Sequence, residues 1–240
     1  MAGHSKWKNI LHKKGKTDAQ RAKLFTKLSR EIIVAVREGG ADPAANARLR
    51  DVIAKAKAGN VPNDNISRVI AKAAGNQDMS NYESVTYEGY GPSGVAVIVE
   101  AVTDNRNRTA SEVRHYFDKY GGNLGATGCV SWSFDKKGVL IVEKAEKDAD
   151  TVMMEALDAG ASDFEEGDEV FEIFTEPETF GETRDALEQS GYVFLSADVE
   201  MVPQNTVTLS DEDERKQMQK MLDMLEDNDD VQNVWHNWEE

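Results

Sequence analysis

The sequence predicts an α+β fold in which an N-terminal three-helix bundle is followed by two α/β domains, the last of them ferredoxin-like. Three observations support this prediction. Apolar residues recur at helical spacing as far as residue 75, and after residue 84 the period changes to that of strands. From Gly138 onward the elements follow the order strand–helix–strand–strand–helix–strand, which is the ferredoxin-like pattern.

Three helices are predicted near the N-terminus, each with an apolar stripe and each ended by glycine. They are expected at residues 17 to about 38, 42 to about 59, and 62–75. The second begins at Asp42-Pro43 and the third at Pro62-Asn63, where proline suits the first helical turn. Because the turns between them are short, the helices are expected to pack as a small bundle.

The middle of the chain is predicted to contain three strands and one helix, with strands at 85–90, 95–103 and 130–134 and a helix at about 110–120. The string GYGPSG between the first two strands matches the dinucleotide-binding pattern G-x-G-x-x-G. That pattern requires a helix after the glycines, whereas a strand follows here. The sequence therefore predicts a hairpin turn at this point.

The C-terminal third supplies the ferredoxin-like elements, expected at 139–143, 151–158, 163–166, 170–175, 180–189 and 193–202. A further helix follows Ser210, with Met218, Met221, Leu222 and Leu225 at helical spacing. Residues 231–235 are expected to form a last strand.

Charge is distributed unevenly along the chain, whose net charge is −16. Residues 1–80 contain 16 Lys and Arg against 7 Asp and Glu, a net charge of +9. Residues 81–240 contain 12 Lys and Arg against 37 Asp and Glu, a net charge of −25. A polyanion is therefore attracted to the N-terminal part and repelled by the rest.

The first helix is predicted to bury one face and to present a basic stripe on the other. The apolar stripe is formed by Phe25, Leu28, Ile32 and Val36, and the basic stripe by Lys23, Lys27, Arg30 and Arg37. The preceding arm, MAGHSKWKNILHKKGK, is basic and has no acidic residue. This combination is typical of proteins that bind phosphate backbones, because each neutralised phosphate releases counterions. An ordinary amphipathic surface helix is the alternative.

A second candidate site is the segment TDNRNRT, residues 103–109, which joins a strand to a helix. Asn107 or Thr109 is expected to cap the helix, and Glu112 would complete a capping box with Thr109. A helix N-terminus favours anions, and Arg106 and Arg108 would add forked donors suited to phosphate. Alternatively, the polar residues only build the turn and the arginines pair with nearby acidic side chains.

The sequence offers no sign of catalysis. It has no G-x-S-x-G, H-E-x-x-H or Walker A motif and no cysteine pair for zinc. Acidic clusters, such as Asp227 with Asp229-Asp230, lack the EF-hand pattern and are interpreted as solvated loops. We therefore expect no enzyme, no cofactor, no metal site and no small-molecule substrate.

Several features favour a cytoplasmic location. No segment approaches the roughly 20 apolar residues that a membrane span needs. The basic N-terminus has no apolar region of the kind found in secretory signals. The single cysteine, Cys129, cannot form an internal disulfide. No membrane partner is expected.

Three strings, MAGHSKWKNI, YEGYGPSGVAVIVEAVTDNRNRT and GGNLGATGCVSW, are similar to motifs of the YebC/PmpR family, whose relatives include the mitochondrial translational activator of cytochrome oxidase. The resemblance covers essentially the whole chain. It implies a helical domain at 1–80, a middle α/β domain at 81–136 and 204–240, and an inserted ferredoxin-like domain at 137–203. It also implies that the C-terminal helix and strand return to complete the middle domain.

The resemblance implies that the arm, the first helix and the TDNRNRT segment bind nucleic acid. Together with Lys16 of the arm and Arg30 of the basic stripe, the predicted nucleic-acid-binding residues are Lys6, Lys8, Lys13, Lys14, Lys16, Arg21, Lys23, Lys27, Arg30, Arg106 and Arg108. Replacing Lys23, Lys27 and Arg30 together with Ala is expected to weaken binding without unfolding the chain.

The leading functional hypothesis is a DNA-binding transcriptional regulator that contacts double-stranded DNA. The alternative is a translation factor that binds ribosomal RNA or the ribosome and relieves slow translation. The third helix carries only Arg68 and Lys72, which is few for reading base edges, so backbone contacts are expected to dominate on either target. Further alternatives are an acidic protein–protein adaptor that docks through residues 137–203 and a metal-dependent nuclease that uses the acidic loops.

Overall fold

The structure is a computed structural model that describes residues 18–75, 81–145 and 147–239. Contacts divide the chain into two compact units. Among the described residues, one unit is formed by the continuous segment Phe134–Gln204 together with Glu239, and the other combines Asp18–Ser133 with Asn205–Trp238. The helices near the N-terminus and the middle sheet thus belong to one unit, and the predicted boundaries between three domains stay a prediction.

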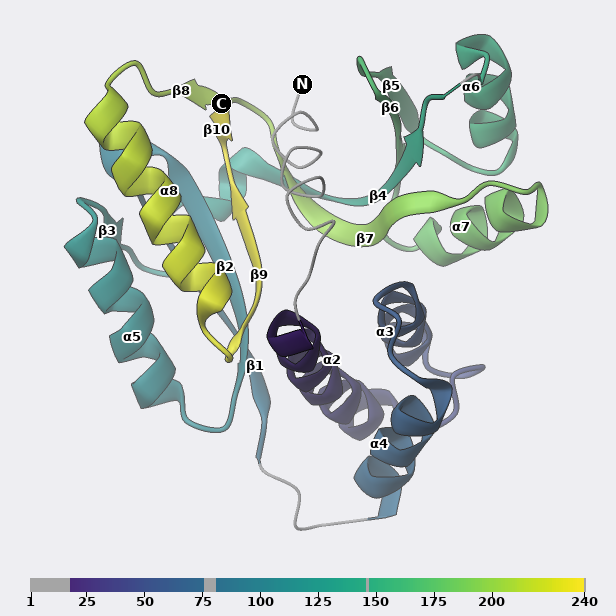
Figure 1. The fold of residues 1–240 in the computed structure, drawn as a ribbon, viewed down its shortest axis with the longest axis horizontal. Coiled ribbons are helices and arrows are strands. Elements are labelled where there is room, and N and C mark those ends of the chain that lie inside the picture. The colour runs from purple at the N-terminus through teal and green to yellow at the C-terminus, as the bar shows by residue number, and fades with distance from the viewer. Residues whose placement is uncertain (1–17, 76–80, 146, 240) are drawn as a thin grey trace. The chain divides into compact units, whose positions relative to one another are not determined.

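Three helices open the described chain, namely α2 (Asp18–Gly39), α3 (Ala47–Ala58) and α4 (Asn63–Gly75) (Figure 1). The predicted apolar stripe of the first helix is confirmed, because Leu28, Ile32 and Val36 are buried in a core with Leu49 of α3 and Ile66 of α4. The helix is not simply two-faced, however. Ile33 and Val34 are also buried but lie outside this core, so α2 is covered on more than one side.

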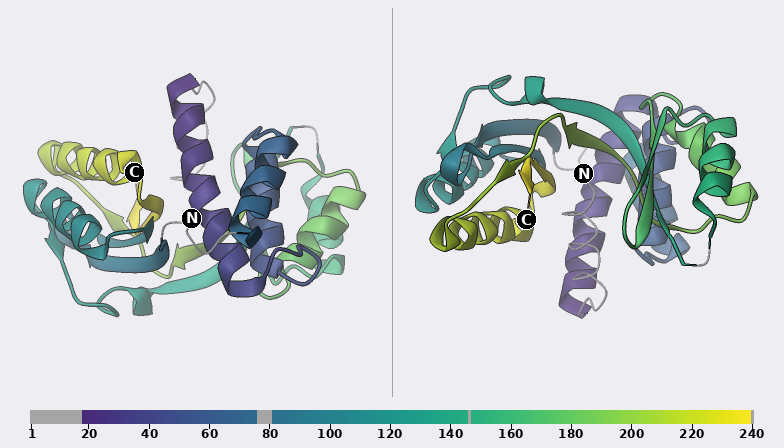
Figure 2. Two further views of the ribbon diagram at one scale, coloured as in Figure 1. Left: turned by 90° about the horizontal axis from the view of Figure 1, so that it is seen from below. Right: turned by 90° about the horizontal axis from the view of Figure 1, so that it is seen from above.

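The same unit contains a four-stranded sheet in the order β3-β1-β2-β9. Its strands are β1 (Glu83–Tyr90), β2 (Ala96–Thr103), β3 (Asn123–Leu124) and β9 (Val231–His236). The helices α5 (Arg106–Lys119) and α8 (Glu212–Asp227) lie side by side on one face of this sheet (Figure 2). As the family resemblance implied, the C-terminal helix and strand belong with the middle sheet, where β9 pairs antiparallel with β2.

The core of this sheet follows the strand period. Val95, Val97 and Val99 point to one face and pack against Phe117 of α5 and Leu225 of α8. The GYGPSG string forms a connection between the antiparallel strands β1 and β2, with a short turn of helix, Pro92–Gly94. The predicted hairpin is therefore confirmed. A second pairing, between β8 (Val207–Thr208) and β10 (Trp238–Glu239), makes a small two-stranded sheet.

The continuous unit has the predicted ferredoxin-like fold. Its elements are β4 (Phe134–Glu143), α6 (Ala149–Asp158), β5 (Asp163–Glu166), β6 (Val170–Thr175), α7 (Phe180–Gln189) and β7 (Phe194–Pro203) (Figure 1). The sheet is antiparallel in the order β5-β6-β4-β7. Leu140, Phe171, Phe180 and Leu187 are among the residues that fill the core beneath the two helices.

Three expected boundaries are wrong. The second helix begins at Ala47 rather than at Asp42-Pro43, because the side chain of Asn46 caps it by accepting a hydrogen bond from the backbone N–H of Leu49. Residues 42–46 form turns instead. Residues 130–134 are not a separate strand, because Ser131–Ser133 make a helical turn and Phe134 already begins the long strand β4.

The helix after the TDNRNRT segment also starts earlier than expected. It begins at Arg106, and the cap is Asn105, whose side chain accepts from the backbone N–H of Arg108 at 3.1 Å. Neither Asn107 nor Thr109 caps the helix, and the expected capping box is therefore absent. Thr109 is buried and its hydroxyl is engaged elsewhere, as described below.

Within the described part of the chain, no helix has the length and apolar character needed to cross a membrane.

Candidate nucleic-acid interface

The structure tests the placement of six of the predicted binding residues. Lys6, Lys8, Lys13, Lys14 and Lys16 lie outside the described residues. The remaining six lie on α2 and at the start of α5. Four of these six meet residues 226–230, which end α8 and lead into β9 and are called the acidic turn below.

The two lysines of the basic stripe bond to the start of the acidic turn. Lys23 Nζ lies 2.6 Å from Asp227 Oδ1 and 3.7 Å from Asp229 Oδ1, and it also donates to the carbonyl oxygen of Asp227. Lys27 Nζ donates to the carbonyl oxygen of Glu226 at 2.7 Å. The basic stripe thus faces the C-terminal end of α8, where carbonyl oxygens lack helical partners and the helix dipole is negative.

Asp230 binds cations from both candidate segments. Its Oδ1 accepts from Arg30 Nη1 at 2.7 Å, and its Oδ2 accepts from Arg108 Nη2 at 2.7 Å and from the Thr109 hydroxyl at 2.7 Å. The residue is only 3% exposed. Burial alone would raise the pKa of Asp230, but the hydrogen bonds from Arg108 and Thr109 and the two arginine charges outweigh it and lower the pKa. Asp230 is therefore a charged, fully paired buried group.

This arrangement corrects the interpretation of the acidic cluster as a solvated loop. Asp227 and Asp229 are exposed as expected, but Asp230 joins α2 to the start of α5. Arg30 therefore cannot be treated as a freely removable surface charge, because its loss would leave a buried carboxylate with one arginine partner fewer. The expectation that Lys23, Lys27 and Arg30 are all replaceable without effect on folding is for this reason restricted to the two lysines.

The arginines of the TDNRNRT segment have different surroundings. Arg108 donates to Asp104 Oδ1 at 2.8 Å as well as to Asp230, and these hydrogen bonds raise the pKa of its guanidinium. Arg106 is 63% exposed at its side chain and has a looser ion pair, at 3.6 Å, with Glu83. The sequence left open that the arginines pair with nearby acidic side chains. Arg108 does so closely, whereas the pairing of Arg106 is looser.

The other basic residues of the helices differ in their surroundings. Arg37 donates to the carbonyl oxygen of Tyr82, and the guanidinium of Arg30 lies 5.3 Å from the centre of the Tyr82 ring. Arg21, at the start of α2, is exposed. On α3 and α4, the exposed cations include Arg50, Lys57, Arg68 and Lys72. Of these four, only Arg68 and Lys72 were weighed from the sequence as residues that could read base edges.

A second ordered feature of this unit is the loop before β4, which the sequence did not single out as a site. Glu88 is 4% exposed, and its carboxylate accepts backbone N–H groups of Gly128, Val130 and Ser131 at 2.8–2.9 Å. Burial would raise the pKa of Glu88, but these three hydrogen bonds lower it. The loop presents Trp132, whose ring is held by a hydrogen bond to a backbone carbonyl although the residue is 70% exposed.

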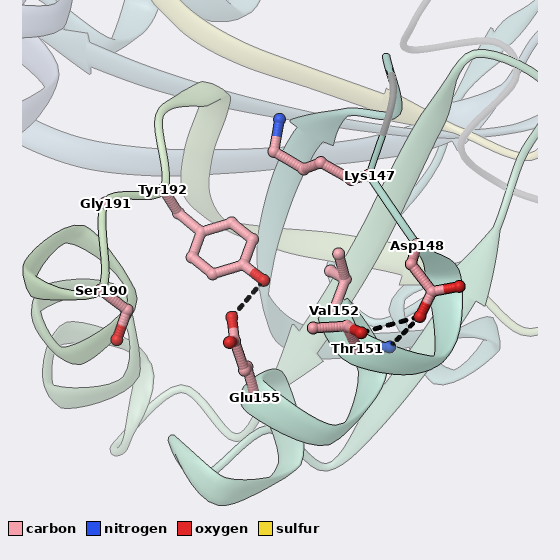
Figure 3. Close-up of a pocket in the computed structure, with 8 residues that line it drawn as sticks. All are labelled: Lys147, Asp148, Thr151, Val152, Glu155, Ser190, Gly191 and Tyr192. Carbon is pink, nitrogen blue, oxygen red and sulfur yellow. Dashed lines mark hydrogen bonds between the residues drawn. The ribbon is translucent and has the colours of Figure 1, made fainter.

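The ferredoxin-like unit contains an open pocket of about 250 Å³ between the start of α6 and the loop that follows α7 (Figure 3). Its lining includes Lys147, Asp148, Glu155 and Tyr192. Tyr192 donates to the Glu155 carboxylate at 2.5 Å, and burial together with this carboxylate raises the pKa of Tyr192 to about 12. One lysine against two carboxylates gives this pocket no preference for phosphate.

Among the described residues, no three His, Cys, Asp or Glu side chains are grouped so that they would hold a metal ion.

Two family descriptions match the chain. Residues 5–76 match the TACO1/YebC protein N-terminal domain, and residues 82–238 match the TACO1/YebC second and third domain. Together these two matches cover most of the chain.

Named relatives and a solved structure agree with this match. A protein from Acetivibrio thermocellus is 64% identical over 239 residues, which is 99% of each chain, and one from Caldicellulosiruptor saccharolyticus is 59% identical over 241 residues, covering 100% of this chain and 99% of the relative. Both are named "Probable transcriptional regulatory protein". A crystal structure of a conserved hypothetical protein from Aquifex aeolicus superposes with a TM-score of 0.84 at 49% identity, covering 93% of this chain and 92% of that one. The chain therefore belongs to the TACO1/YebC family.

Proposed function

We propose that this protein is a nucleic-acid-binding regulator of gene expression in the cytoplasm, and that it acts as a DNA-binding transcriptional regulator. The observation that carries the proposal is the convergence of cations from two distant segments. Lys23, Lys27 and Arg30 of α2 and Arg108 of α5 bind anionic or carbonyl oxygens of one short turn. A surface that already holds such oxygens has the donor geometry that a phosphate backbone requires.

Two further findings support a regulator rather than an enzyme. The N-terminal 80 residues have a net charge of +9, so a polyanion is drawn to the part of the chain that contains α2. The relatives named above are regulatory proteins by name. We therefore propose that the protein does not cleave or modify the nucleic acid that it binds, and incubation with labelled DNA and RNA in Mg²⁺ should leave both intact.

The second candidate function is that of a translation factor bound to ribosomal RNA. The absence of an identified base-reading helix favours backbone contacts, which serve RNA as well as DNA. On α4 the basic side chains are Arg68 and Lys72, and Arg68 already bonds to Asn65. No observation on the chain favours the adaptor hypothesis for residues 137–203 over these two.

Ultraviolet crosslinking in living cells, followed by sequencing of the recovered nucleic acid, tests the proposal. Enrichment of discrete promoter DNA is expected. A Lys23→Ala/Lys27→Ala variant should yield several-fold less crosslinked nucleic acid than the native protein. The control Lys216→Ala/Lys220→Ala, which removes the same charge from α8, should yield as much as the native protein. Crosslinks concentrated on ribosomal or transfer RNA would assign the protein to translation, and recovery of no nucleic acid would contradict both functions.

A further inference from the structure

Three of the four residues of the basic stripe of α2, namely Lys23, Lys27 and Arg30, are not open to a ligand, because the acidic turn binds them. Lys23 and Lys27 bond to Asp227, Asp229 and the Glu226 carbonyl, and Arg30 bonds to the carbonyl oxygen of Asp229 at 2.6 Å. A phosphate backbone and the acidic turn offer the same chemistry to these cations, namely closely spaced oxygens with negative charge. Only one of them can fill the stripe at a time.

Burial divides these contacts into two classes. The side chains of Asp230 and Arg30 are 5% and 17% exposed, and removing either partner leaves the other, largely buried charge with one ionic partner fewer. The side chains of Asp227 and Asp229, in contrast, are 79% and 63% exposed. Ion pairs of this second class contribute little to stability and exchange readily with other ions.

We propose that the acidic turn is an internal competitor of nucleic acid, in which Asp227 and Asp229 occupy Lys23, and the carbonyl oxygen of Glu226 occupies Lys27, until a phosphate backbone displaces them. The inference rests on the proposed function and states how the same site is regulated. Arg30 and Arg108 stay with Asp230 in both states and hold the end of α8 near α2. The residues that exchange oxygens of the acidic turn for those of phosphate are the two lysines.

Competition by the acidic turn favours ligands with many phosphates over ligands with one. A single phosphate ion must break the lysine contacts with the acidic turn and gains little in return. A nucleic acid that also contacts other basic groups of the N-terminal part recovers that cost through its additional contacts. Inorganic phosphate at millimolar concentration is therefore expected to leave binding of an oligonucleotide nearly unchanged.

The test compares dissociation constants for a short labelled DNA duplex and a short labelled RNA at about 50 mM salt, where electrostatic contacts are strong. Asp227→Asn/Asp229→Asn should bind about threefold to tenfold more tightly than the native protein, because two competing ion pairs are removed. The control Asp213→Asn/Asp223→Asn makes the same change of net charge on α8, at exposed side chains, and Asp223 accepts a hydrogen bond from Gln219 of the same helix. It should change the affinity less than about twofold.

A double-mutant cycle separates competition from a general effect of charge. In a Lys23→Ala/Lys27→Ala background, Asp227→Asn/Asp229→Asn should no longer tighten binding, since the sites that the carboxylates occupy are gone. Tightening of equal size in both backgrounds, or tightening by the control, would overturn the proposal. If the native protein binds but the Asn variant binds no better, the acidic turn is not a competitor. If no variant binds either nucleic acid, the proposed function itself is wrong.

Discussion

At the scale of single residues, Asp230 shows what a linear sequence does not reveal. It stands in a run of acidic and polar residues that resembles any solvated turn, and its neighbours Asp227 and Asp229 are exposed. Its burial depends on Arg30 and Arg108, which are about 200 and 120 positions away in sequence. Local spacing predicted both arginines as cationic site residues, but it contains no information about the carboxylate that lies between them.

A second residue, His236 of β9, gives the protein a predictable response to acid. Burial lowers the pKa of His236 to about 4, although a backbone hydrogen bond at Trp238 acts in the opposite direction. The unfolded chain binds a proton at this position near pH 6.5. Because the unfolded state takes up the proton first, the free energy of unfolding should fall by roughly 3 kcal/mol as the pH drops from about 6.5 to about 4.

Urea denaturation at several pH values measures this dependence. In His236→Gln the slope between about pH 6.5 and pH 5 should be largely lost, because the titrating group is gone. His115→Gln, at an exposed position on α5, should keep the native slope. An NMR titration that found His236 protonated near pH 6.5 in the folded protein would contradict the prediction.

At the scale of elements, local signals predicted which segments are helices and strands better than where each begins. The bounds expected for α2 and α4 are within a residue of those observed, because threonine, proline and glycine residues mark their ends in the sequence. The start of α3 was misplaced because Asp42-Pro43 has the composition of a helix start. Asn46 takes that role instead through contacts that depend on how α2 and α3 pack.

Asn46 is 5% exposed and fixes the corner between these two helices. Its side chain caps α3 and donates to the carbonyl oxygens of Ala35 and Gly40, both at 2.8 Å. Asn46→Ala should lower the free energy of unfolding by about 2–3 kcal/mol, since it removes a helix cap and two further hydrogen bonds to backbone carbonyl oxygens. Thermal or urea denaturation measures the loss. Asn107→Ala, at an exposed position on α5, should cost less than about 0.5 kcal/mol, and an equal loss in the two variants would refute the role of Asn46.

The misplaced strand at residues 130–134 has a similar cause. The sequence shows an apolar alternation there, but three backbone N–H groups of this loop bond to the carboxylate of Glu88 rather than to a neighbouring strand. A buried side chain thus replaces a partner strand, and β4 begins only at Phe134. Such a substitution of partners is not visible in the local pattern of apolar residues.

At the scale of the whole molecule, the charge imbalance along the sequence predicted the candidate site only in part. It indicated α2 as basic, whereas the TDNRNRT segment was indicated by two arginines at the start of a helix. The structure brings Lys23, Lys27, Arg30 and Arg108 to one turn. It did not show that the strongly acidic remainder of the chain supplies the side chains that meet them. Opposite charges in different parts of one chain attract each other as well as an external ligand.

If binding is dominated by phosphate contacts, affinity should fall steeply with salt. With about six contacts, roughly a thousandfold is expected to be lost between about 50 and 200 mM salt. Fluorescence anisotropy with a labelled duplex measures the dependence. Removing Lys23 and Lys27 should reduce the slope of log Kd against log salt by about 2, because two phosphate contacts are lost. A Kd that does not change with salt in the native protein would mean that the basic residues do not bind phosphate.

The discontinuous unit has a consequence for the order in which the chain folds during synthesis. The segment Phe134–Gln204 is continuous, so a nascent chain holds all of its strands before Val231–His236 has been made. The middle sheet is completed later, because β2 lacks its partner β9 until Val231–His236 has been synthesised. The ferredoxin-like unit is thus expected to fold on the ribosome before the middle sheet is complete, and the edge of β2 that β9 covers stays unpaired and open to wrong partners until Val231–His236 has emerged.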